Sequence, residues 1–278
     1  MPDLLRRALV VITLGPLTLF LIYQGGWWYF LPFAALLTIA TIEFSQLTRK
    51  LGWKTPLWLL LPIVFALWLL PFPVRTMLFG SPVIEVDLVS LTLLIGLSAA
   101  LGFVLWLYER RENEDAPGSW MATIGGIMLL GWLGSHFFKL RGLEVDKAAE
   151  WTALAMLGTW IADSSAYVFG KTLGRHKLSP RLSPNKTIEG YVGGIIAGTA
   201  ITVLIAYFLK LSLPVAVILG LLVSIVSPAG DLGVSLLKRS VGVKDSGTLL
   251  PGHGGALDRI DSLVWSVAMA YYLVLYTS

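Results

Sequence analysis

Hydrophobic blocks of membrane-spanning length recur along this 278-residue chain, and they restrict its fold more strongly than any other feature. A bilayer-spanning helix needs roughly 17–25 predominantly apolar residues. Apolar residues make up 56% of the chain and charged residues only 14%, whereas soluble globular domains are about 45–50% apolar. The sequence therefore predicts an all-α, polytopic integral membrane protein.

About nine transmembrane helices can be placed on the sequence. Their ranges are Leu9–Tyr23, Trp27–Gln46, Leu57–Phe72, Leu88–Tyr108, Met121–Phe138, Trp151–Phe169, Tyr191–Leu209, Leu213–Ser227 and Ile260–Tyr276. The third is short and bracketed by prolines, so it could be kinked or re-entrant. The eighth could continue past Pro228. Spans 1–5 fall in an N-terminal region, residues 1–150, and spans 6–9 in a C-terminal region, residues 151–278.

The basic residues predict an orientation. With a cytoplasmic N-terminus and nine alternating spans, only five of the 21 Lys and Arg fall outside: Arg75, Lys139, Arg141, Lys147 and Lys210. The remaining 16 lie inside, which favours a cytoplasmic N-terminus under the positive-inside rule. The net charge of +4 is then explained by loops that face anionic lipid, and no nucleic-acid partner is expected.

Two features narrow the chemistry of the chain. It contains no cysteine, which excludes disulfides, thiolate catalysis and Cys-ligated metal centres. Glu43 lies inside the second span, where a carboxylate is expected either to serve a functional site or to pair with another helix or reach the interface.

The first polar motif runs from Asp163 to Gly190. Asp163 lies within the sixth span, where a charge costs roughly 2.5–3.5 kcal/mol, so it should be paired or face a wet cavity. The following loop carries Lys171, Arg175, His176, Lys177, Arg181 and Lys186. Ser183 as N-cap with Pro184 at the first helical position predicts a helix start. Lys186 would then lie in a first turn that favours an anion. A basic loop that contacts lipid headgroups explains the charge equally well.

The helix after this loop carries glycine at every fourth position. Gly190, Gly194 and Gly198 share one face, which predicts close approach of a neighbouring helix. We interpret these glycines as packing residues.

The second polar motif begins with a helical stripe and continues into a Gly-rich turn. Asp231, Ser235 and Lys238 are spaced i, i+4, i+7, with Arg239 next to them. Lys244 follows in a turn, and Pro251–Gly255 would let backbone N–H groups approach a ligand closely. His253 and Gly254 lie within that turn.

Two further aspartates, Asp258 and Asp261, lie one turn apart after the Gly-rich turn. With Asp231 they could converge on a hard divalent cation such as magnesium, which takes one or two protein carboxylates plus substrate phosphates. Lys186, Lys238, Arg239 and Arg259 could neutralise phosphate charge. These acids and bases could instead form mutual salt bridges, and His253 could be a turn residue. No cysteine or second histidine accompanies it, which disfavours zinc.

The second motif, SLLKR-x4-KD-x5-PGHGG-x-LDR-x-D, resembles the signature of bacterial phosphatidate cytidylyltransferases, the CDP-diacylglycerol synthases. The upstream block DSSAYVFGKTLGRHKLSPRLSPNKTIEG is similar to the other polar block of that family. The resemblance covers roughly residues 155–278. One position departs from it, because Val234 stands where a polar or acidic residue is expected.

The resemblance implies that CTP and phosphatidate give CDP-diacylglycerol and pyrophosphate, with magnesium and, as an open question, a second, monovalent cation. With the cytoplasmic orientation above, we expect a multi-pass protein of the inner (cell) membrane in which the two polar motifs come together at a polar cavity that faces the cytoplasm; a homodimer is left open. The resulting metal set is Asp231, Asp258 and Asp261, and the catalytic set is Asp231, Lys238, Arg239 and Asp258. The substrate-binding set is Lys186, Ser235, Lys244, His253, Gly254 and Arg259.

Other functions fit parts of the sequence. A transporter or channel would explain intramembrane Asp163 and Glu43, although most charges lie in loops and helix ends on one side. A CDP-alcohol phosphotransferase would need a D-G-x2-A-R run that this chain lacks. A membrane scaffold with a basic headgroup-binding patch would bind without turnover.

Overall fold

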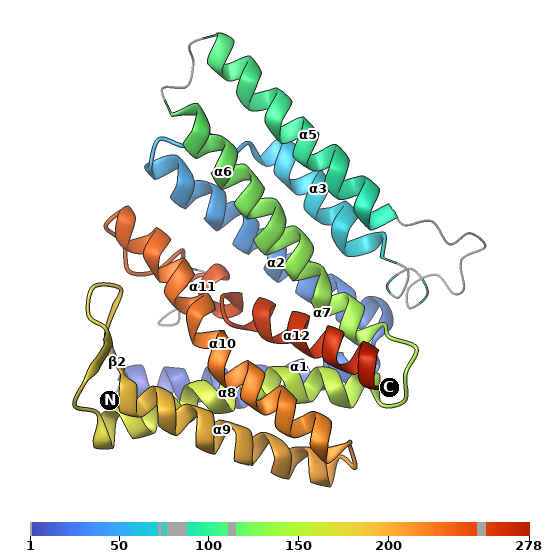
Figure 1. Ribbon diagram of the computed structural model, residues 1–278, viewed down its shortest axis with the longest axis vertical. Coiled ribbons are helices and arrows are strands. Elements are labelled where there is room, and N and C mark those ends of the chain that lie inside the picture. The colour runs from blue at the N-terminus through green and yellow to red at the C-terminus, as the bar shows by residue number, and fades with distance from the viewer. Residues whose placement is uncertain (1, 72–73, 75, 77–87, 111–114, 249–253) are drawn as a thin grey trace.

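A computed structural model describes residues 2–71, 74, 76, 88–110, 115–248 and 254–278, and it is almost entirely helical (Figure 1). The elements are α1 (Pro2–Gln24), α2 (Gly26–Lys50), α3 (Leu57–Leu69), α5 (Leu88–Glu109), α6 (Ala116–Gly126), the π-helix η1 (Ile127–Leu133), α7 (Gly134–Arg141), α8 (Ala148–Leu173), β1 (Lys177–Ser179), β2 (Ser183–Thr187), α9 (Ile188–Phe208), α10 (Leu213–Ser240), α11 (Leu257–Ile260) and α12 (Leu263–Thr277).

Six helical segments of the described chain are long and apolar enough to cross a membrane. They are Gly26–Lys50, Thr92–Glu109, Ala116–Arg141, Ile188–Phe208, Leu213–Ser240 and Leu257–Thr277. These segments confirm a multi-pass helical membrane protein and match six of the nine predicted spans. The other three predicted spans fall on α1, α3 and α8, so a total of nine stays a prediction.

The third and eighth predicted spans, whose course the prolines left open, behave differently. The helix α3 has 13 residues with Pro62 inside it, about 20 Å at 1.5 Å per residue, which is shorter than a hydrocarbon core of roughly 30 Å. The helix α10 continues through Pro228 to Ser240. The eighth span therefore does extend beyond Pro228, and its last turns carry the second polar motif.

Helices α8, α9 and α10 pack closely at the bottom of the view in Figure 1, where α8 and α9 run side by side. A Cβ atom at Gly194 would lie 2.9 Å from the Ala166 Cβ, and one at Gly198 would lie 3.0 Å from the Ala162 Cα. Both alanines belong to α8. The predicted glycine face of α9 is confirmed as the contact surface that lets the two backbones approach.

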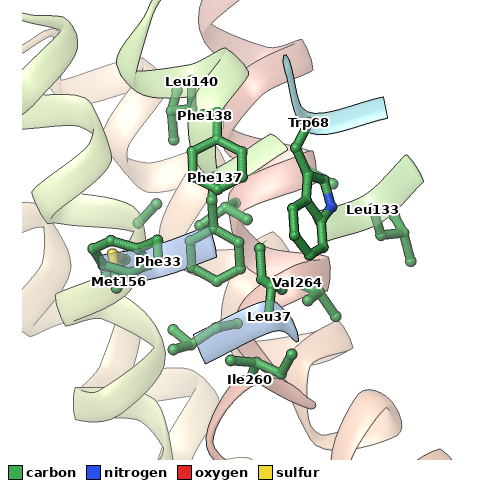
Figure 2. Close-up of a cluster of buried hydrophobic side chains, with 14 of the residues drawn as sticks. Phe33, Leu37, Trp68, Leu133, Phe137, Phe138, Leu140, Met156, Ile260 and Val264 are labelled. Atoms are coloured by element: carbon green, nitrogen blue, oxygen red, sulfur yellow. The ribbon is translucent and has the colours of Figure 1, made fainter. Parts of the chain in front are cut away.

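The hydrophobic core joins both halves of the chain, as Figure 2 shows. The residues in this close-up come from α2, α3, η1, α7, α8, α11 and α12: Phe33, Leu37, Trp68, Leu133, Phe137, Phe138, Leu140, Met156, Ile260 and Val264. Buried Trp68 donates its indole N–H to the Leu130 carbonyl at 2.8 Å. Helix α2 packs against α11, which carries Asp258 of the second polar motif.

The predicted helix start at Ser183 is wrong, because Ser183–Thr187 forms a strand. It pairs antiparallel with β1, with Lys177 opposite Thr187. A residue that precedes proline is biased towards extended backbone, which favours the strand at Ser183-Pro184. Helix α9 begins at Ile188, and the Thr187 hydroxyl caps it by accepting from the Gly190 N–H at 3.1 Å. Lys186 therefore projects from a hairpin and not from a helical turn.

Candidate active site

The two polar motifs meet, as the sequence predicted, through an ion pair between β2 and α10. The Lys186 Nζ lies 2.6 Å from the Asp231 Oδ2, and both side chains are about a third exposed at 28% and 30%. A second contact holds the hairpin to α10, because the Arg239 Nε donates to the Leu182 carbonyl at 3.3 Å. The hairpin is thus fastened to the end of α10 at two points.

The stripe predicted on α10 is confirmed. Asp231, Ser235 and Lys238 all lie in this helix, and the Ser235 hydroxyl donates to the Asp231 Oδ1 at 3.2 Å. Asp231 therefore receives donors at both carboxylate oxygens, one from its own helix and one from the hairpin.

Lys238 extends from the same stripe to Asp258 in α11. Its Nζ lies 2.5 Å from the Asp258 Oδ1, and the two side chains are only 9% and 6% exposed. The other oxygen, Oδ2, accepts from the Ser246 N–H at 2.8 Å and the Gly255 N–H at 3.0 Å, and the Ser246 hydroxyl oxygen lies 3.0 Å from it. The buried charge of Asp258 is thus compensated by one cation and two backbone N–H donors, as a buried carboxylate requires.

Glu43, from the N-terminal half, reaches the same loop. Its carboxylate accepts from the Ala256 N–H at 3.0 Å, the Leu257 N–H at 2.9 Å and the Ser246 hydroxyl at 2.7 Å. Of the alternatives open for this residue, contact with another segment is the one observed, although the partner is a loop and the start of α11.

The Gly-rich turn provides one of the positive φ angles expected of it. Gly254 has a φ of 79°, and a Cβ atom there would lie 2.6 Å from the Asp258 Oδ2. This position therefore requires glycine for both its backbone angle and the nearby carboxylate. Pro251, Gly252 and His253 lie outside the described residues.

Three carboxylates interact electrostatically beside these ion pairs. Asp261 is buried, accepts from the Ser262 N–H at 2.7 Å, and interacts with the charges of Asp231 and Asp163. Asp163 also interacts with Lys186. In the described part of the chain, no three His, Cys, Asp or Glu side chains are grouped as tightly as metal ligands. The assignment of Asp231, Asp258 and Asp261 to a metal stays a prediction.

The remaining predicted cations differ in their surroundings. Arg239 is exposed and donates through Nη1 to the Val243 carbonyl at 3.2 Å, in addition to its contact with the hairpin. Lys244 and Arg259 are exposed, and neither side chain forms a hydrogen bond or ion pair with another described residue. Arg259 interacts with the charge of Asp163.

Two residues of the site were not assigned to it from the sequence. Ser246 lies between the Glu43 and Asp258 carboxylates, and only its position after Lys244-Asp245 could have indicated it. Glu43 carried a visible signal, a carboxylate in an apolar span, but 213 residues separate it from its partner Ala256.

Helical membrane architecture and this cluster of lysines, arginines and carboxylates define a membrane-embedded protein equipped to handle anionic groups.

Comparison with known proteins identifies the family. Residues 5–277 match the cytidylyltransferase family. The chain is 31% identical to the phosphatidate cytidylyltransferase of Bacillus subtilis (strain 168) over 280 aligned positions, which cover 99% of this chain and 98% of that protein. It is 45% identical to the phosphatidate cytidylyltransferase of Staphylococcus aureus (strain COL) over 178 positions, 63% of this chain and 67% of that protein.

The chain therefore belongs to the cytidylyltransferase family. It is a nucleotidyltransferase enzyme of phospholipid biosynthesis, which confirms the family that the two polar motifs resemble.

Proposed function

We propose that this enzyme transfers the cytidylyl group of CTP to phosphatidate, forming CDP-diacylglycerol and pyrophosphate. The names of the similar proteins from Bacillus subtilis and Staphylococcus aureus support these substrates. One observation of the structure carries the proposal. Lys186 of the first motif pairs with Asp231 in α10, and Lys238 of α10 pairs with Asp258 in α11, so two cations lie where a polyanion could be held.

The reaction places particular demands on the protein. A phosphate oxygen of phosphatidate attacks the α-phosphorus of CTP in line, a new P–O bond forms, and the bond to the bridging oxygen of pyrophosphate breaks. Both reactants are anionic, so catalysis rests on positioning and on charge neutralisation. The lipid phosphate is itself the nucleophile, and no protein nucleophile is needed.

The ion pairs supply cations that a substrate can recruit. Lys186 and Lys238 are held in place by Asp231 and Asp258, and phosphate oxygens would compete with these carboxylates for them. Arg239 directs two N–H groups at backbone carbonyls, which leaves others of its five donors for bidentate contact with phosphate. The substrate-binding role extends to exposed Lys244 and Arg259, to Ser235 and to the backbone at Gly254.

We propose magnesium as the metal of this site. Asp163, Asp231 and Asp261 repel one another electrostatically, a repulsion that a cation would relieve, and carboxylate oxygens are the ligands that magnesium prefers. Asp231 and Asp258 would hold the ion, with Asp261 beside them. When bound, it would shield the triphosphate and stabilise the leaving pyrophosphate. A second, monovalent cation belongs to the same proposal.

The membrane arrangement follows from the substrates. The acyl chains of phosphatidate would stay in the bilayer while its headgroup enters a polar cavity that faces the cytoplasm, where CTP is available. The positive-inside count supports an N-terminus on that side, and we propose the inner (cell) membrane as the location. Assembly as a homodimer stays a prediction.

One assay tests the proposal. Purified protein in detergent with labelled CTP, phosphatidate and magnesium should yield a labelled lipid after extraction, and a chelator should abolish that product until magnesium is restored. Asp258→Asn should lose nearly all activity while it keeps its elution volume on size-exclusion chromatography. Wild-type turnover by that variant would overturn the metal assignment. Absence of any lipid product from wild-type protein would overturn the reaction.

A further inference from the structure

Glu43 is a buried carboxylate that the reaction scheme does not use. Its side chain belongs to α2, a membrane span of the N-terminal half, and the residue is 6% exposed. It accepts from two consecutive backbone N–H groups, those of Ala256 and Leu257, and from the Ser246 hydroxyl. A buried carboxylate with three donors is a strong, charge-assisted anchor.

The polypeptide wraps closely around this carboxylate. A Cβ atom at Gly247 would collide with the Glu43 Oε1, and one at Gly255 would collide with the Glu43 Oε2 and the Ser246 Oγ. The backbone on both sides of the Gly-rich turn therefore approaches Glu43 more closely than any larger residue allows. The loop is shaped around a side chain from another span.

Ser246 connects this anchor to Asp258. Its hydroxyl oxygen lies 2.7 Å from the Glu43 Oε2 and 3.0 Å from the Asp258 Oδ2. A hydroxyl carries one proton and can donate to only one carboxylate at a time. The shorter distance indicates donation to Glu43, so the Asp258 Oδ2 is held by the two backbone N–H groups of Ser246 and Gly255.

We infer that Glu43 is a positioning residue of the active site: it holds the segments on either side of the Gly-rich turn, and thereby fixes Asp258 opposite Lys238. This inference rests on the proposed function for its catalytic meaning. Glu43 is buried and its carboxylate is occupied by its three donors, so its effect on turnover would be transmitted through Ser246, Ala256 and Leu257.

The loop can be tested without an activity assay, because the chain has no cysteine. Ala256 is fully buried, so the single thiol of Ala256→Cys should react slowly with a maleimide. Glu43→Gln replaces one acceptor oxygen by an N–H donor that faces other donors. In the Glu43→Gln background, the thiol at position 256 should react roughly 10- to 100-fold faster, because loss of an anchor raises the population of locally open loop.

Three controls separate local release from general unfolding. Glu109→Gln makes the same chemical change at an exposed residue of the same half, and it should leave the thiol at position 256 protected. Ala155→Cys places a thiol at a fully buried site in α8, and that thiol should stay protected in the Glu43→Gln background. Thr248→Cys lies at an exposed position and should react rapidly in both backgrounds.

Kinetics then test the catalytic meaning in cysteine-free protein. Glu43→Gln should lower kcat for cytidylyl transfer about 10- to 100-fold, since misplacement of a reacting group by 1 Å can cost about 10²-fold. Its KM for CTP should change much less, because the exposed cations remain. Ser246→Ala keeps both backbone bonds to Glu43 and should fall between Glu43→Gln and wild type.

The outcomes are distinguishable. A protected thiol at position 256 together with wild-type kcat in Glu43→Gln overturns the inference. Equally faster maleimide labelling of the thiols at positions 155 and 256 in the Glu43→Gln background also overturns it, because Glu43 would then support the whole fold. Faster labelling confined to position 256 supports the anchor even if wild-type protein forms no CDP-diacylglycerol, in which case the proposed reaction fails and the positioning of the loop stands.

Discussion

Lys238 and Asp258 form an ion pair that is almost completely withdrawn from solvent, with Nζ 2.5 Å from Oδ1 and exposed side-chain fractions of 9% and 6%. Removing one partner of such a pair leaves an uncompensated buried charge. The pair therefore links the stability of the site to its charge balance, and the two contributions can be separated by mutation.

Lys238→Met should destabilise the protein by about 3–5 kcal/mol, because Asp258 would keep its charge without its cation. The double variant Lys238→Met/Asp258→Asn removes both charges and should recover much of that loss, while cytidylyl transfer stays abolished. Thermal unfolding followed by tryptophan fluorescence in detergent measures the first effect, and the labelled-CTP assay measures the second. A double variant less stable than the single one would contradict this account.

The Lys186–Asp231 pair should behave differently because its side chains are about a third exposed. Solvent screening reduces the contribution of such a pair to between zero and about 1 kcal/mol. Lys186→Gln should therefore leave the unfolding midpoint nearly unchanged but raise KM for CTP or phosphatidate. Unchanged values of KM for both substrates would remove Lys186 from the phosphate site.

The close packing of α8 against α9 predicts a steric effect. Gly194→Val would place its Cβ 2.9 Å from the Ala166 Cβ and 3.1 Å from the Ala162 carbonyl oxygen, and overpacking of this kind costs roughly 1–3 kcal/mol. Gly102→Val is the matched control, since nothing lies within 4 Å of a Cβ at that helical position. Equal unfolding midpoints for the two variants would argue against the glycine contact surface.

Arg239 should hold the hairpin in addition to its proposed role with phosphate. Arg239→Ala removes the donors to the Leu182 and Val243 carbonyls, so amide hydrogens of β1 and β2 should exchange with solvent faster. Arg175→Ala, a matched change nearby, should not have this effect, because only the backbone N–H of Arg175 contacts Glu189. Hydrogen-exchange mass spectrometry of the hairpin peptides distinguishes the two variants.

The sequence predicted those features that depend on periodicity and local spacing. The stripe of Asp231, Ser235 and Lys238 and the glycine face of α9 follow from helical geometry, which is local. The predicted helix start at Ser183 was wrong because Ser183 and Pro184 fit both a helix cap and an extended strand. The antiparallel pairing with Lys177–Ser179 stabilises the strand.

Long-range contacts could not be predicted in the same way. No local pattern relates Glu43 to Ala256, since the contact depends on how α2 packs against α11. The encounter of Lys186 with Asp231 was expected in general terms from a shared cytoplasmic side, whereas the partner of each lysine depends on the tertiary fold.

The fit of Gly247 and Gly255 around Glu43 has a consequence for how this enzyme can diverge over time. A methyl group at either glycine would occupy the space of the carboxylate, so the Glu43 side chain would have to move away from its three donors. Substitutions at positions 43, 247 and 255 should therefore be inherited together. A residue larger than glycine at position 247 or 255 should be accompanied at position 43 by aspartate or by a residue without a carboxyl group. Descendants of this gene are expected to retain the three residues as a set or to lose them as a set.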